Sequence, residues 1–175
     1  ISRMRICMIT TFYPPYNFGG DGIFVERLSH ALARRGHQVE VIHCVDAFLA
    51  GGGTRRPAMA RQEHHNVTVH SLKSPFGLLS PLATQQTGRP FFKSARILKI
   101  LESGFDVIHY HNISLVGGPG ILALGDAVKL YTAHEHWLVC PNHILWRHNR
   151  ELCDGRECFR CSLAFKRPPQ LWRKT

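Results

Sequence analysis

Long hydrophobic runs are missing from this sequence. No apolar stretch reaches the roughly 18 residues that a membrane-spanning helix requires, and the N-terminus has no apolar core of the kind found in a secretory signal peptide. These two absences make the cytoplasm the expected compartment.

Acidic residues are also scarce. The chain of 175 residues has 12 Asp and Glu against 22 Lys and Arg, which gives a net charge of +10 and a pI near 9.8. This surplus predicts an anionic partner: a phosphate-bearing small molecule, an anionic lipid surface or a nucleic acid. The basic residues are dispersed and not interleaved with stacking aromatic residues, which argues against nucleic acid. Binding to anionic lipid would make the protein peripheral at the inner face of the membrane.

The sequence contains a β/α pattern, which is clearest between residues 4 and 41. Met4–Thr10 and Val39–Cys44 are apolar without alternation, as expected of parallel strands buried on both faces. Between them lie a glycine loop and an amphipathic helix, for which we expect Asp21 as the N-cap and Gly36 as the stop. This unit predicts a right-handed β-α-β crossover.

The following segments continue the pattern. We expect strands over 66–72, 105–112 and 126–132, a helix over 91–103 and a turn with a short helix in 113–125. The segments 46–66 and 73–90 lack periodicity, so we expect irregular loops there. The predicted fold class is α/β, with a Rossmann-like parallel sheet and helices on both faces.

Glycines and polar residues follow three of the expected strands. These residues are Gly19 and Gly20, His111 and Asn112, and His134 and Glu135. Ligands of open parallel sheets bind beyond the carboxyl ends of the strands, so we expect all six at one rim of the sheet. The adjacent pair His64 and His65 is interpreted as a surface feature.

Four of the six cysteines are close together in the sequence. Cys140, Cys153, Cys158 and Cys161 have the spacing Cys-x12-Cys-x4-Cys-x2-Cys within 22 residues. This spacing predicts that the four thiolates wrap one structural zinc ion. An iron–sulfur cluster and unliganded or redox-paired thiols remain open, and His136, His143 and His148 lie near enough in sequence to replace one cysteine.

Several motifs in order resemble the N-terminal, acceptor-side domain of family 4 glycosyltransferases, which have the GT-B fold. The motifs are Arg5-Ile-Cys-Met-Ile-Thr, Pro-Pro-x3-Gly-Gly at 14–20, Phe24-Val25-x2-Leu28-x3-Leu32-x3-Gly36-His37-x-Val39, Phe105-Asp-Val-Ile-His-Tyr-His111 and Tyr131-Thr-Ala-His134-Glu135. The resemblance covers roughly residues 4–161, and the cysteine segment is a feature of one subgroup only.

The resemblance implies a retaining hexosyltransferase that moves a sugar from a nucleotide-sugar donor to a saccharide or lipid-linked acceptor. It implies that Gly19 and Gly20 approach the donor phosphates and the acceptor, as backbone without side chains can. It further implies that His111 is catalytic and hydrogen-bonds the transferred sugar, and that His134, with Asn112 and Glu135 beside it, lines the cleft. No catalytic metal is expected, because a helix dipole and basic side chains stabilise the leaving phosphate.

The expected organisation has three parts. Residues 4–136 form the Rossmann-like domain, 137–162 the cysteine segment packed on it, and 163–175 the start of a connection to a C-terminal donor-binding domain that lies outside this chain. Alone, the chain is expected to be inactive and to bind at most the acceptor.

Three alternatives remain at this point. A nucleotide-dependent oxidoreductase would share the fold class, but the chain lacks Gly-x-Gly-x-x-Gly after the first strand, and Asp46 only approximates the acidic residue that ends the second. A zinc-containing nucleic-acid-binding module would leave the β/α pattern unexplained. A non-catalytic partner subunit of a split glycosyltransferase is the third.

Overall fold

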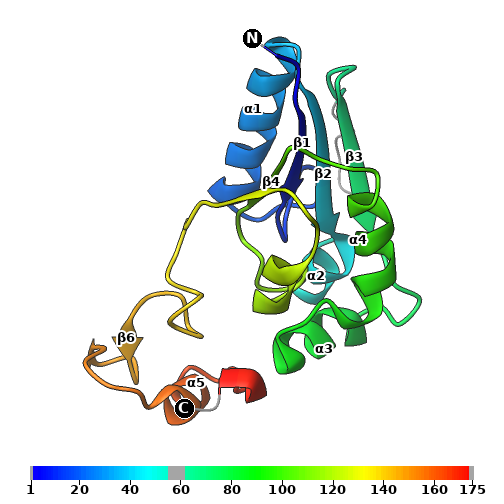
Figure 1. Ribbon diagram of the computed structural model, residues 1–175. Coiled ribbons are helices and arrows are strands. Elements are labelled where there is room, and N and C mark those ends of the chain that lie inside the picture. Colours follow the sequence, from blue (N-terminus) through cyan, green and yellow to red (C-terminus); the bar gives the residue numbers. More distant parts are fainter. Residues whose placement is uncertain (1, 55–61, 174–175) are drawn as a thin grey trace.

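A parallel sheet of five strands forms the centre of the protein, as seen in the computed structural model, which describes residues 2–54 and 62–173 (Figure 1). The strands are β1 Arg5–Ile9, β2 Gln38–Cys44, β3 Val67–Leu72, β4 Val107–Tyr110 and β5 Val128–Tyr131. Their order is β3-β2-β1-β4-β5, and every neighbouring pair is parallel. The predicted α/β class and parallel sheet are confirmed.

Helices cover both faces of the sheet. Helix α1 (Gly20–Arg34) packs Val25 and Ala33 against one face. Helices α2 (Val45–Ala50) and α4 (Ser94–Leu101) lie on the other face, together with the 3₁₀ helix η2 (Pro119–Ala123). Figure 1 shows α1 on one side of the strands and α2 and α4 on the opposite side. Burying both faces explains the continuous apolar runs of β1 and β2.

Several local expectations are wrong. The segments expected to be irregular contain α2 and also α3 (Leu79–Thr87), in which Pro81 is tolerated because it lies in the first turn. The helix expected over 91–103 is present, with its first turn as the 3₁₀ helix η1 (Phe91–Lys93) and the remainder as α4. Part of the expected loop, residues 55–61, lies outside the described residues.

The start of α1 also differs from the expectation. Its N-cap is Gly19, no side chain caps it, and Asp21 lies within the first turn. The stop is as predicted, since Gly36 follows the helix with a φ of 92° that favours glycine.

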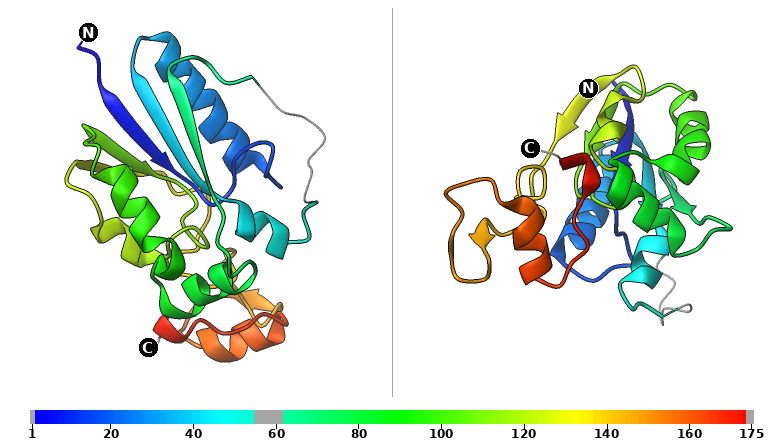
Figure 2. Two further views of the ribbon diagram at one scale, coloured as in Figure 1. Left: turned by 90° about the vertical axis from the view of Figure 1, so that its right-hand side faces the viewer. Right: turned by 90° about the horizontal axis from the view of Figure 1, so that it is seen from below.

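The cysteine segment lies beyond the carboxyl edge of the sheet, on the side of the expected rim (Figure 2). It contains the short antiparallel pair β6 (Trp146–Arg147) and β7 (Glu151–Leu152) and the first part of helix α5 (Cys158–Ala164); the 3₁₀ turn η3 (Leu171–Arg173) follows it in the sequence. The chain then returns to the main body, where the Trp172 Nε1 donates to the Gln85 carbonyl at 3.1 Å. Throughout 2–54 and 62–173, no helix is long and apolar enough to cross a bilayer.

Candidate functional site at the carboxyl edge of the sheet

The connections leaving β1 and β4 diverge at the carboxyl edge. The chain after β1 runs to α1 on one face of the sheet, whereas the chain after β4 runs to η2 on the other face. Because β1 and β4 are neighbours, their carboxyl ends form a topological switch point, where ligands of open α/β sheets bind. Gly19 and Gly20 follow β1, and His111 and Asn112 follow β4, so this point brings together four of the predicted site residues.

Asn112 holds the two loops together. Its side-chain amide donates to the Asp21 carboxylate at 3.0 Å, and its Oδ1 accepts hydrogen bonds from the Ser114 backbone N–H and hydroxyl at 3.2 and 2.7 Å. The side chain is therefore engaged with the protein itself. Its role in this arrangement is to position the start of α1 against the end of β4.

The glycines around the start of α1 differ in the space available for a Cβ atom. A Cβ on Gly20 would meet nothing within 4 Å, and one on Gly19 would lie 3.6 Å from the Asp21 carboxylate, an ordinary contact. A Cβ on Gly22 would lie 2.3 Å from the Asn17 side chain and 2.9 Å from the Phe12 carbonyl. The fold thus requires Gly22, which sequence reasoning did not select, while the surroundings of Gly19 and Gly20 leave space beside the backbone.

Three histidines and one phenylalanine form a cluster at the ends of β4 and β5. The Nδ1 of His111 lies 3.1 Å from the Nε2 of His134, and the rings of His109 and His111 have centroids 4.1 Å apart. The exposed ring of Phe24, from α1, lies against both His111 and His134. His111 is fully buried, and its Nε2 has no hydrogen-bond partner among the described residues.

Burial, reinforced by the neighbouring His109 and His134 rings, lowers the pKa of His111 to about 3. The imidazole is therefore neutral at physiological pH. A neutral ring can share one hydrogen with His134 through Nδ1 and present Nε2 as a single donor or acceptor, but it brings no positive charge to the site.

Glu135 is placed away from this cluster. Its carboxylate lies 2.5 Å from the Nδ1 of His143, so it pairs with the cysteine segment instead. Of the six residues predicted at the rim, the structure therefore brings His111 and His134 into direct contact and joins Asn112 to α1.

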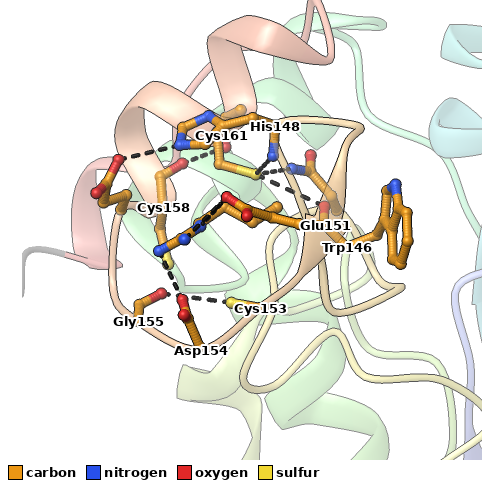
Figure 3. Close-up of polar contacts among 12 residues, drawn as sticks. Trp146, His148, Glu151, Cys153, Asp154, Gly155, Cys158 and Cys161 are labelled. Atoms are coloured by element: carbon orange, nitrogen blue, oxygen red, sulfur yellow. Dashed lines mark hydrogen bonds and ion pairs between the residues drawn. The ribbon is translucent and has the colours of Figure 1, made fainter.

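The four cysteines surround one small cavity without forming a metal-binding group. All four line a cavity of ≈ 20 Å³, yet within the described ranges no three His, Cys, Asp or Glu side chains are arranged to hold a metal ion. The Cys161 sulfur accepts hydrogen bonds from the Asn142 amide and the His148 backbone N–H, both at 3.3 Å, while Cys153 is exposed and directed to the Gly155 carbonyl (Figure 3). The tetrahedral site expected from the spacing is thus not supported by this geometry.

A larger cavity, which the sequence motifs did not indicate, lies at the ends of β2 and β3, and we call it the Asp46 cavity. It has a volume of ≈ 680 Å³, and Tyr16, Asp46, Ser71, Lys73 and Leu78 contribute to its wall. Asp46 is the second residue after β2, as His111 is the first after β4, so the rule that places ligands beyond the carboxyl ends of strands could have indicated it.

The protein-family comparison agrees with this fold. Residues 18–159 match the family model "Glycosyltransferase Family 4", which is more than half of the chain. The protein belongs to glycosyltransferase family 4. That assignment accounts for the β/α pattern, which a nucleic-acid-binding module would leave unexplained, and it does not need the Gly-x-Gly-x-x-Gly motif of the oxidoreductase alternative.

The other comparisons add little. The search of curated proteins finds no match. Among solved structures, the chain is similar to a DNA/pantothenate metabolism flavoprotein from Streptococcus pneumoniae, with 14% identity, a TM-score of 0.30, and coverage of 61% of this chain and 38% of that one. The chain thus spans well under half of that structure.

Proposed function

We propose that this chain is the acceptor-binding half of a retaining hexosyltransferase of the GT-B type. In the reaction, the bond between the anomeric carbon of a nucleotide sugar and its diphosphate breaks, and a bond from an acceptor hydroxyl to that carbon forms, the hydroxyl proton leaving with the diphosphate. A separate C-terminal domain would hold most of the donor, so the chain alone would bind acceptor without turnover.

The observation that carries this proposal is the unpartnered Nε2 of His111 at the switch point. Buried polar atoms are nearly always hydrogen-bonded, so an orphaned one at a ligand-binding edge points to a missing partner. A hydroxyl group of the transferred sugar fits this role, because a neutral imidazole exchanges hydrogen bonds with hydroxyls without requiring charge.

The glycine loop supplies the second part of the proposed site. Gly20 begins α1, and the space beside its Cα allows an anionic group to approach backbone N–H groups at the positive end of the helix. We assign this approach to the donor phosphates.

Exchanging His111 for Gln in the two-domain protein tests the proposal. We expect kcat to fall by about 100-fold or more, the size typical of removing one transition-state hydrogen bond. His109→Gln is the matched control, because His109 lies in the same ring stack but bonds Thr132 at 2.8 Å instead of facing an unpartnered position. Equal losses in both variants would reduce His111 to a structural role.

Two finer expectations stay predictions. Cytoplasmic location is an expectation from the sequence alone. Peripheral binding to anionic membrane is supported by exposed Phe76, Leu79 and Phe92 around α3, with Arg89 close by in the sequence. Sedimentation with anionic vesicles, compared between the native chain and Leu79→Ser, tests this membrane binding.

Structural zinc is tested by elemental analysis of the purified chain, where less than about 0.1 zinc per chain would contradict a structural zinc ion.

A further inference from the structure

The Asp46 cavity has features of a ligand site that the histidine cluster does not use. Its volume of ≈ 680 Å³ lies within the range of small-molecule sites. It opens at the carboxyl ends of β2 and β3, and Tyr16, from the same loop that leads to Gly19, forms part of its wall. The cavity and the switch point are therefore two ends of one continuous edge.

Asp46 is an incompletely satisfied acid in this wall. Its side chain is 1% exposed, its Oδ2 accepts the Ser74 backbone N–H at 2.7 Å, and its Oδ1 has no hydrogen-bond partner among the described residues. Leaving a buried carboxylate oxygen unpaired is costly, and Asp46 belongs to the cavity wall, so we expect a ligand in the cavity to supply the missing donor. Hydroxyl groups of a sugar or polyol are such donors.

Positive charge flanks this acid. Lys73, directly after β3, is exposed and lines the cavity, and its charge acts on Asp46. The ammonium of Lys93 is buried nearby, where it donates to the Ser80 and Thr84 hydroxyls at 3.0 and 2.9 Å and also acts on Asp46. Burial raises the pKa of Asp46, and the charges of Lys93 and Lys73 act against that rise, so the surroundings of the carboxyl group are positive and suit an anionic ligand.

The remaining wall is aromatic and apolar. Tyr16 is held by a stacked contact with His43, with centroids 5.9 Å apart, and by an edge contact with Phe48. Leu78 is 59% exposed at the cavity. The Tyr16 ring and the Asp46 carboxylate, which can accept a hydrogen bond from a hydroxyl, lie in one cavity wall. Together they match the apolar faces and the polar edges of a sugar ring.

We propose that the Asp46 cavity binds the acceptor as a glycosyl phosphate or diphosphate, with Asp46 Oδ1 accepting from a ring hydroxyl and Lys73 pairing with the phosphate. This inference rests on the proposed function, because it names the substrate that the transferase would extend. The phosphate has two sources, a soluble sugar phosphate or the head of a lipid-linked sugar diphosphate.

Binding to the purified chain tests the site independently of catalysis. The probes are a panel of hexose 1- and 6-phosphates, the same hexoses without phosphate, inorganic phosphate alone, and a prenyl-diphosphate hexose in detergent micelles. Calorimetry or NMR titration up to about 10 mM covers the weak range expected of half a site. A soluble hexose phosphate that binds as well as the prenyl-linked one identifies a soluble acceptor, and tighter binding of the latter identifies a lipid-linked one.

Two variants test the proposed contacts of Asp46 and Lys73 separately. We expect Asp46→Asn to weaken hexose phosphate binding by about tenfold or more, the size typical of hydrogen bonds to a charged group, and Lys73→Gln to weaken it about threefold. Lys99→Gln, which removes an exposed lysine on α4 and makes the same change in charge, should have no effect. Lys73 is exposed, so its variant reports on binding without threatening the fold.

Three outcomes would overturn the inference: no binding of any phosphorylated hexose, equal binding of inorganic phosphate and the whole panel, or binding unchanged by both cavity variants. Failure of the proposed function is a different result. In that case the chain binds hexose phosphate through Asp46 and Lys73, but the two-domain protein transfers no sugar from any nucleotide sugar.

Discussion

The two flanks of the carboxyl edge differ in how far their polar side chains are already hydrogen-bonded within the protein. On the β4 and β5 flank, His111, His134 and Asn112 already bond one another or the start of α1. On the β2 and β3 flank, Asp46 and Lys73 line an open cavity of ≈ 680 Å³. The first flank is a preorganised polar cluster, and the second is a space lined with opposite charges.

Each flank nevertheless keeps one buried polar atom without a partner. These atoms are His111 Nε2 and Asp46 Oδ1. The comparison teaches that a functional position is marked less by residue type than by the bond that the chain does not complete. A neutral imidazole suits an uncharged hydroxyl, as the proposed transfer requires of His111, whereas a carboxylate with nearby lysines suits the polar, anionic acceptor that we propose for the Asp46 cavity.

The largest effect on the first flank should come from the glycine that the fold requires. Gly22→Ala should lower the free energy of unfolding by about 1–3 kcal/mol, because its Cβ would press on Asn17 and on the Phe12 backbone. Gly20→Ala should leave stability unchanged or slightly improved. Denaturant unfolding of both variants measures the difference, and equal destabilisation would show that the loop is packed differently.

A pH titration compares the two flanks directly. Burial lowers the pKa of His43, near the Asp46 cavity, to about 4, as it lowers that of His111 to about 3. Both histidines are then neutral in the folded chain but take up a proton near pH 6.5 when unfolded, so they stabilise the fold above pH 6.5 and this contribution is lost as the pH falls.

Between pH 7.5 and 5.5 each histidine should remove at most about 1.4 kcal/mol of stability. His43→Gln and His111→Gln should each flatten the fall in the free energy of unfolding, measured with urea at both pH values. His65→Gln, away from both flanks, is the control. If neither flank variant changes the slope, the histidines are not kept neutral by burial.

The smallest effect concerns the bond between Asn112 and Asp21. Asn112→Ala should cost about 1 kcal/mol of stability, since it leaves the Asp21 carboxylate without its 3.0 Å donor. It should also raise KM more than it lowers kcat in the two-domain protein, because the loops lose their relative position. Thermal unfolding and steady-state kinetics measure both, and an unchanged KM would leave the bond with a folding role only.

Much of the fold was predictable because β1, β2 and β4 are buried runs with a clear composition. The short helices α2 and α3 could not be predicted, because six to nine residues give too little periodicity. In α3, Pro81 also made the segment look like a loop. Spacing alone placed His111 and His134 at one rim. It could not show that Glu135 pairs with His143, because that contact depends on where the cysteine segment folds back.

The cysteine spacing shows the same limit. A Cys-x2-Cys pair within a 22-residue segment indicates that four sulfurs can meet, and all four do line one cavity. Ligand geometry depends on side-chain directions, which spacing does not contain. The sequence likewise shows that Asp46 follows the second strand, but its burial beside a cavity depends on how α2 and the residues after β3 pack.

Because the chain returns to the main body at Trp172, the conformational entropy available to the cysteine segment is restricted. Arg173 stacks on Trp172 at 4.2 Å, lies over Trp137 at 5.1 Å and donates to the Trp137 and Leu138 carbonyls. The stretch from Trp137 to Trp172 is therefore a closed loop, fastened noncovalently where it leaves the Rossmann-like body and where it comes back. Such closure restricts a segment in which many of the large apolar side chains are exposed, and opening this fastening would release the whole cysteine segment at once.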